Sequence, residues 1–170
     1  LTRKLICENW DVCLITRKDP TFTYINDILN QVKILKYEGN IKKLIECFRE
    51  TRPKVVFHLA SLFLTDHSTN DVDNLIKSNI MFGTHILEAM VHSNVNTIVN
   101  TGTSWQHYNN DDYNPVNLYA ATKQAFESIL KYYTETKGIR AITLELFDTF
   151  GPNDNRSKII NLLRKISRDN

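Results

Sequence analysis

The sequence predicts an α/β fold with a doubly wound parallel sheet, and three observations support this prediction. Short β-rich runs alternate with helical patterns along the chain. Residues 54–59 form an almost continuous apolar run, which is typical of a parallel strand covered on both faces. The chain has 170 residues, of which 42% are apolar and 24% charged, so it suits one domain with a sizeable core. Strands and helices that alternate in this way pack as a parallel sheet between helices.

The first third of the chain is predicted to hold two helices and three strands. It opens in a helical pattern, with Leu1 and Leu5 among charged neighbours. A second helix is predicted from apolar side chains at helical spacing, and Pro53 ends it because proline cannot continue a helix. The expected elements are the opening helix, strands at residues 11–16 and 32–35, a helix at residues 41–49 and the strand at residues 54–59.

The rest of the chain continues the alternation. Pro115 precedes a helix that carries Tyr119 and Lys123, and Gly138 ends this helix because glycine readily adopts the left-handed conformation. The expected elements are a long helix at residues 71–92, a strand at 95–100, the helix after Pro115, a strand at 141–147, a turn at Gly151 and a helix at 157–166.

Charge and composition argue against several kinds of partner. The net charge is +2 and the cations lie among acids, so no nucleic acid partner is expected. No run of about 18 apolar residues occurs, so no membrane-spanning helix is expected. The histidines share no ligand spacing, so no metal site is expected. Cys7, Cys13 and Cys47 are expected to be reduced thiols in a cytoplasmic protein.

Tyr119, Lys123 and Ser104 form the candidate catalytic set. Tyrosine and lysine four residues apart share one face of a helix, and an ammonium nearby favours the phenolate and lowers the pKa of a tyrosine. A hydroxyl such as that of Ser104 can hold a substrate oxygen while the tyrosine moves its proton. Ser104 follows a predicted strand, and ligands of such sheets lie at the carboxyl ends of strands. The residues therefore predict interconversion of a carbonyl and an alcohol beside a nicotinamide.

Five short motifs occur along the chain in a particular order. They are Gly39-Asn40-Ile41, residues 56–61 (VFHLAS), residues 79–84 (NIMFGT), Ser104 with residues 119–123 (YAATK), and residues 146–152 (LFDTFGP). In this order they resemble the extended short-chain dehydrogenase/reductase family of nucleotide-sugar epimerases, dehydratases and ketoreductases. Asn40, Asp148 and Phe150 depart from the family pattern. The resemblance implies a Rossmann-like sheet that binds a nicotinamide dinucleotide.

The resemblance also implies which residues contact the cofactor. They are Asn40 and Ile41 at the adenine, Leu59, Ala60 and Ser61 after a central strand, and Asn79, Thr101, Tyr119 and Lys123. Arg17 and Lys18 end the second family strand where NAD-preferring members have an acid, so NADPH is expected. The alternative is that Arg17 and Lys18 form a solvated turn.

Two parts of the family pattern are not found in the sequence. The first strand with its glycine-rich turn would precede Leu1, and a substrate domain would follow the last residues. We therefore expect an incomplete Rossmann-like fold, with an NADP-binding domain at residues 1–152 and the start of a substrate-binding region at residues 153–170. Such a fragment is expected to bind cofactor poorly, because a gap in the sheet centre leaves strand edges unpaired.

The loop after Ser104 bears on the reaction. Family dehydratases have an Asp-Glu pair where this chain has Trp105 and Gln106, so dehydration is not expected. Trp105 and Gln106 suit contact with a sugar, and loop packing is the alternative. Asp148 and Arg156 are further candidates for substrate contact, although Arg156 also fits a solvated helix start. The closest resemblance is to CDP-3,6-dideoxyhexose synthases, which implies NADPH-dependent reduction of CDP-4-keto-3,6-dideoxyglucose to CDP-abequose or CDP-paratose for O-antigen.

Other functions stay open on the sequence. A nucleotide-sugar 4-epimerase of the same family would use a tightly held NAD. A non-catalytic remnant would keep the fold without turnover. A homodimer is expected to be possible for the complete protein.

Overall fold

The structure is a computed structural model that describes residues 1–16, 22–151, 159, 162–163 and 166–167. In chain order the regular elements are α1 (Thr2–Cys7), β1 (Val12–Thr16), β2 (Val32–Lys36), α2 (Ile41–Thr51), β3 (Val56–His58), α3 (Val72–Ile76), α4 (Phe82–His92), β4 (Thr97–Thr103), α5 (Leu118–Lys137) and β5 (Arg140–Leu146). The predicted alternation of strands and helices is confirmed. The helix expected at residues 157–166 falls largely outside the described residues.

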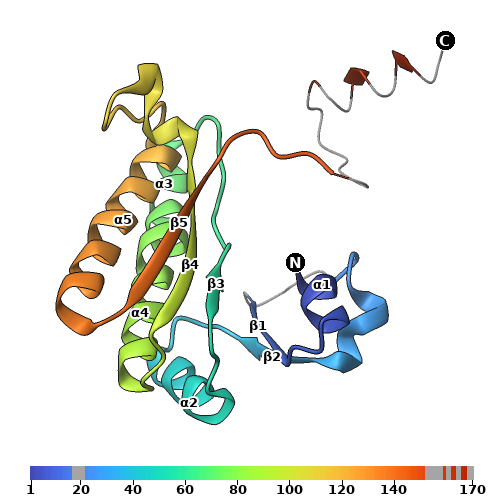
Figure 1. Cartoon of the computed structure of the whole chain (residues 1–170). Coiled ribbons are helices and arrows are strands. Elements are labelled where there is room, and N and C mark those ends of the chain that lie inside the picture. Colours follow the sequence, from blue (N-terminus) through green and yellow to red (C-terminus); the bar gives the residue numbers. More distant parts are fainter. Residues whose placement is uncertain (17–21, 152–158, 160–161, 164–165, 168–170) are drawn as a thin grey trace.

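The strands form two parallel sheets instead of one. β1 pairs with β2, and β3, β4 and β5 pair in that order, all in parallel (Figure 1). A cavity of about 870 Å³ separates them, lined by Val12 to Ile15 on one side and residues 55–60 on the other. The expected break in the sheet centre therefore lies between β1 and β3.

The helices cover one face of the larger sheet. α4 and α5 pack against β4 and against each other. α2 packs on α4 near the C-terminal end of α4 (Figure 1). The opposite face of β5 is open in the described part of the chain, with Ile142 60% and Leu144 47% exposed. A strand of a doubly wound sheet normally has helices on both faces, so this one is half covered.

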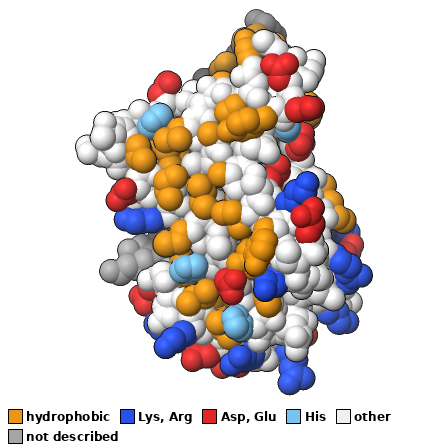
Figure 2. Space-filling view, turned by 90° about the vertical axis from the view of Figure 1, so that its left-hand side faces the viewer, with side chains coloured by type: hydrophobic (Ala, Val, Ile, Leu, Met, Phe, Trp, Pro, Cys, Tyr) orange, Lys and Arg blue, Asp and Glu red, His pale blue; other side chains and the backbone are white. Residues whose placement is uncertain are grey.

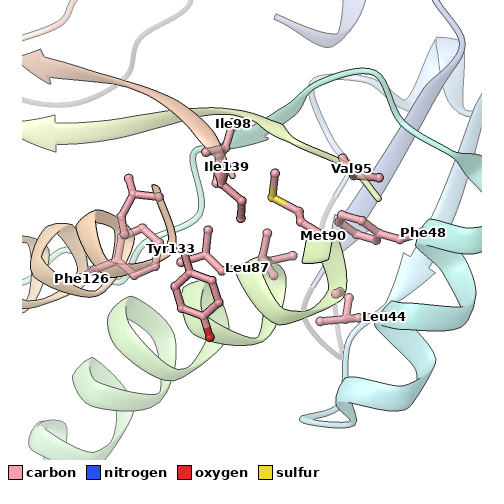
Figure 3. Packing of buried hydrophobic residues seen from close by; sticks show 12 residues of the cluster. Leu44, Phe48, Leu87, Met90, Val95, Ile98, Phe126, Tyr133 and Ile139 are labelled. Carbon is pink, nitrogen blue, oxygen red and sulfur yellow. The ribbon is translucent and has the colours of Figure 1, made fainter. Parts of the chain in front are cut away.

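One core joins the two sheets. Leu44 and Phe48 of α2 point toward Met90 and Val95, while Phe126 and Tyr133 of α5 close the other end around Leu87 (Figure 3). α2 also reaches the smaller sheet, since the free thiols of Cys47 and Cys13 on β1 share a hydrogen bond, with their Sγ atoms 3.9 Å apart. α2 thus contacts the β1–β2 unit, and so does α4, because Tyr37 after β2 hydrogen-bonds His85 and packs on Phe82.

The long helix predicted at residues 71–92 contains an irregular turn. α3 passes into a π-helical turn at Lys77–Met81 before α4 begins. A π turn inserts one extra residue into a helix and is frequent near functional sites. This turn carries Asn79, which is buried.

The surface on the side of α5 mixes apolar and charged side chains. Hydrophobic side chains run in a band along this face, and cations and anions intermingle around it (Figure 2). Among the described helices, none combines the length and hydropathy needed to cross a bilayer.

Candidate active site

The loop after β3 forms one side of the site. Asn79 Oδ1 accepts a hydrogen bond from Leu62 N at 2.7 Å and one from Ser61 Oγ at 3.2 Å. Its Nδ2 donates to Leu62 O at 3.0 Å and to Thr122 Oγ1 on α5 at 2.9 Å. With only 2% of its surface exposed, Asn79 fixes this loop to α5 from inside the protein. Asn79 therefore positions the Ser61–Leu62 backbone, and the cofactor contact expected of it stays a prediction.

The loop after β4 carries Ser104 in a short 3₁₀ turn, Ser104–Gln106. Thr103 and Gln106 form a reciprocal capping box, in which Thr103 N donates to Gln106 Oε1 at 2.9 Å. Such a box satisfies backbone groups at both ends of a turn and holds its geometry. Ser104 is therefore presented from a locked turn at the carboxyl end of β4, as predicted.

Gln106 does not face open space. Its side chain is fully buried, and Nε2 donates to Gln124 Oε1 at 2.9 Å and to Glu127 Oε2 at 3.1 Å. Both acceptors lie on α5, so Gln106 ties the Ser104 turn to the helix of Tyr119 and Lys123. The sugar contact predicted for Gln106 does not fit this geometry, and the alternative of loop packing describes it.

α5 places Tyr119 and Lys123 at its first turns. Asn117 caps this helix, since its Oδ1 accepts from Ala120 N at 3.0 Å. The same amide donates through Nδ2 to Thr65 O at 2.9 Å, so the helix start is fixed to the loop after β3. An N-cap side chain of this kind stabilises a helix by about 1 kcal/mol.

Tyr119 lies in an aromatic corner with Phe63 and Trp105. Its ring meets that of Phe63 edge-on, with centroids 5.0 Å apart, and Phe63 also contacts Trp105 at 5.6 Å. Phe63 therefore contacts both Tyr119 and Trp105, which is the residue after Ser104 in the turn. The arrangement brings the two predicted hydroxyl-bearing residues to the same part of the site.

The pKa values of the pair depend mainly on burial. Burial raises the pKa of Tyr119, and a hydrogen bond with Ser61 opposes this rise. Burial lowers the pKa of Lys123 to about 8, while the charge of Glu127 raises it. The predicted lowering of the Tyr119 pKa by Lys123 is thus not seen, and the net direction is the opposite.

The carboxyl end of β3 is open to a ligand. Leu59 and Ala60 are exposed, and Ala60 and Ser61 have small side chains that leave the backbone approachable. Thr101 fixes this end, because its Oγ1 donates to His58 O at 3.2 Å. The dinucleotide contact expected at Leu59, Ala60 and Ser61 stays a prediction, for which this exposed backbone leaves room.

The other predicted residues lie apart from this set or outside the described chain. Asn40 caps α2 through Lys42 N at 2.9 Å and stays exposed beside Ile41. Asp148 is exposed just beyond β5. Arg17, Lys18 and Arg156 fall outside the described residues. Within those residues, no group of three or more potential metal ligands occurs.

Three residues of the site were missed by the sequence analysis. Phe63 faces Tyr119, Asn117 caps α5, and Glu127 adjoins Lys123. Glu127 could have been found from its spacing, since it lies four residues after Lys123 on the same helix. Phe63 lies in a loop without periodicity, so no sequence signal marked it.

The parallel strands with helices between them form part of a Rossmann-like α/β fold. The sequence pattern of the NAD dependent epimerase/dehydratase family matches residues 1–170. The chain belongs to this family, whose fold the structure contains in part.

Curated relatives are similar over three quarters of the chain. Protein CapI of Staphylococcus aureus is 28% identical over 137 residues, which cover 75% of this chain and 40% of that protein. CDP-abequose synthase of Yersinia pseudotuberculosis is 28% identical over 127 residues, 74% of this chain and 44% of that protein. The chain therefore spans less than half the length of these relatives.

Solved structures share the fold. UDP-glucose 4-epimerase of Thermotoga maritima superposes with a TM-score of 0.80 at 19% identity, over 91% of this chain and 53% of that one. DesIV, a dTDP-glucose 4,6-dehydratase of Streptomyces venezuelae, gives a TM-score of 0.80 at 16% identity, over 99% and 57%. These likenesses concern the fold alone.

Proposed function

We propose that the protein reduces the 4-keto group of a nucleotide-linked deoxysugar with NADPH. The observation that carries this proposal is the corner where Tyr119 and the Ser104 turn meet Phe63, with buried Lys123 on the same helix face as Tyr119. The similarity to CDP-abequose synthase supports CDP-4-keto-3,6-dideoxyglucose as the substrate, and CDP-abequose or CDP-paratose as the product.

Tyr119 is suited to donate a proton. Reduction of a ketone requires an acid that is protonated at neutral pH, and burial raises the pKa of Tyr119 above its ordinary value. Bound NADPH would supply the hydride. Tyr119 would give its hydroxyl proton to the carbonyl oxygen, and Ser104 would donate a hydrogen bond to the same oxygen. Lys123, on the same helix face, would hold the ribose of the bound NADPH.

Substrate and cofactor selection are assigned to residues around this corner. Trp105 and Phe63 offer aromatic surface to a sugar ring, and Phe63 is 55% exposed. Arg17 and Lys18 would accept the 2′-phosphate of NADPH, and Asp148 and Arg156 would contact the substrate. Residues 1–152 would form the cofactor domain, and residues 153–170 would begin the substrate region.

The test follows NADPH absorbance while the purified complete protein is incubated with CDP-4-keto-3,6-dideoxyglucose. Oxidation of NADPH with an abequose- or paratose-type product is the expected result. Interconversion of a CDP- or UDP-hexose without net use of NADPH would instead assign an epimerase. Bound NADPH without reaction on any keto sugar would overturn the reductase and leave a non-catalytic binder.

A further inference from the structure

Glu127 lies one helical turn beyond Lys123, and its carboxylate is enclosed by three segments. Oε2 accepts the hydrogen bond from Gln106 of the Ser104 turn at 3.1 Å. Oε1 is buried and has no hydrogen-bond partner among the described residues. Gly102 of β4 comes so close that a Cβ there would lie 3.0 Å from Oε1. A buried carboxylate oxygen without a partner costs stability, so its presence here points to a role.

Lys123 is the cation that faces this carboxylate along α5. Only 2% of its surface is exposed, and it forms no ion pair within 4.0 Å in the described part of the chain. An ammonium in such a place loses its water and stays charged only with help from an anion. Glu127 is the acid whose charge acts on Lys123.

Other titratable groups around the two residues are few. His58 of β3 adjoins Lys123, and the charge of Lys123 adds to the lowering of the His58 pKa that burial mainly causes. On the far side of Glu127, His107 after β4 pairs with Glu145 of β5 at 3.1 Å. Burial, the largest cause, raises the pKa of Glu127, and the charge of Glu145 adds to this rise, whereas the hydrogen bond from Gln106 and the charges of Lys123 and His107 lower it. The favourable partners of the Glu127 carboxylate are therefore Gln106, Lys123 and His107.

We propose that Glu127 is a positioning residue, which keeps Lys123 charged inside the protein and holds the Ser104 turn against α5 with the same carboxylate. One oxygen of the carboxylate is fastened to the turn by Gln106, and the side chain as a whole supplies the negative charge. The inference concerns the site of the proposed reductase. Only the measurement of turnover rests on the proposed function.

The test compares the titration of Lys123 in the wild-type protein and in Glu127→Gln. Glutamine keeps the size of the side chain and an oxygen that can accept from Gln106, but removes the charge. The pKa of Lys123, followed by NMR of isotope-labelled lysine, is expected to fall by about one unit. The high-pH limb of the kcat/KM profile should move to lower pH by the same amount, because charged Lys123 is needed for the reaction.

Glu135→Gln is the matched control. Glu135 lies on the same helix, is exposed and pairs with Lys131 at 3.7 Å. This variant should leave the titration of Lys123 and the kcat/KM profile unchanged. An unchanged Lys123 pKa in folded Glu127→Gln would overturn the proposal, since the negative charge would then be without effect.

If Glu127→Gln does not fold, titration of Glu127 in a Lys123 variant tests the same proposal. Coupling between two titrating groups acts equally in both directions. Lys123→Met should therefore raise the pKa of the Glu127 carboxyl, read from its carbon-13 shift, and an unchanged value would overturn the proposal. Both titrations are made without substrate. If the protein reduces no keto sugar, the proposed function is refuted, but the titrations still decide whether Glu127 acts on Lys123.

Discussion

At the scale of single residues, burial sets the state of the two central groups of the site. Tyr119 and Lys123 share one face of α5, and burial favours the neutral form of each. For tyrosine the neutral form carries the proton, which suits a group that donates it. For lysine the neutral form has lost its proton, which explains why an acid such as Glu127 matters to it.

Replacing Tyr119 by phenylalanine removes the proton donor and keeps the ring that contacts Phe63. We expect turnover to fall by about 100-fold or more, because a general acid contributes at least that much, while NADPH binding is retained. Steady-state kinetics and fluorescence titration with NADPH measure the two effects. Tyr132→Phe on the exposed side of the same helix is the control. Turnover retained in Tyr119→Phe would refute the role of Tyr119.

His58 makes the stability of the protein depend on pH. It is buried among Phe82 and Phe126, and its Nδ1 lies 3.0 Å from Asn100 Oδ1. Burial, more than any other cause, lowers its pKa from 6.5 to about 4. Between these two pH values the unfolded chain binds a proton that the folded protein excludes, so stability is complete above pH 6.5 and is lost as the pH falls toward 4.

Between pH 6.5 and 4, protonation linked to His58 is expected to lower the free energy of unfolding by about 3 kcal/mol. Urea unfolding at several pH values measures it, with His58→Gln as the comparison. The variant should show a shallower decline in the free energy of unfolding between pH 6.5 and 4. Parallel declines in the two proteins would show that His58 is not the responsible group.

At the scale of elements, the approach of α4 to α5 depends on Gly83. A Cβ at this position would overlap the ring of Phe126, which is completely buried. Gly83→Ala is therefore expected to destabilise the protein by about 1–3 kcal/mol through overpacking, despite the better helix propensity of alanine. Chemical denaturation gives the value. Gly83→Ala combined with Phe126→Leu should cost less than the sum of the single changes, and strict additivity would refute the direct contact.

The sequence predicted the elements that carry strong local signals. α2 follows from its apolar spacing, and α5 follows from its apolar spacing and from its end at Gly138, which the structure uses as a cap; the N-cap role of Asn40 was not predicted. The π turn at Lys77–Met81 was not predictable, because its one extra residue leaves the apolar pattern of a long helix almost unchanged. β4 runs to Thr103, beyond the predicted end, because its pairing with β5 continues to Leu146.

Part of the candidate site could likewise be predicted from the sequence, and part could not. Ser104, Tyr119 and Lys123 come from motifs, and the structure puts all three at the carboxyl side of the larger sheet. The inward turn of Gln106 could not be predicted, since the sequence does not show whether a loop amide faces a ligand or a helix. The buried position of Asn79 depends equally on tertiary contacts, with Leu62 and Thr122.

At the scale of the whole molecule, the two sheets differ in how well they are held. β1 and β2 form a two-stranded sheet whose residues are nowhere fully buried, whereas β4 has neighbours on both sides and buried residues at alternate positions. Two-stranded sheets are marginal in water and depend on what packs against them. The smaller sheet is attached through α2 and through the contacts of Tyr37 with α4.

Hydrogen exchange of this chain should therefore show two levels of protection. Amides of β1 and β2 are expected to open at a lower free energy than those of β4, because fewer buried contacts must be broken. Exchange followed by mass spectrometry of peptides from residues 12–36 and 97–103 provides the comparison. Equal protection in the two regions would contradict the weaker attachment of the smaller sheet.

The π turn limits which changes of chain length the protein can tolerate. A π turn holds one residue more than the α-helical turn it replaces, so removal of one residue from Lys77–Met81 would convert it into a regular helix. Asn79 would then lose the position from which it holds Ser61 and Leu62. Single-residue deletions in this turn should be purged from evolving relatives, whereas insertions in exposed loops such as residues 109–113 should accumulate.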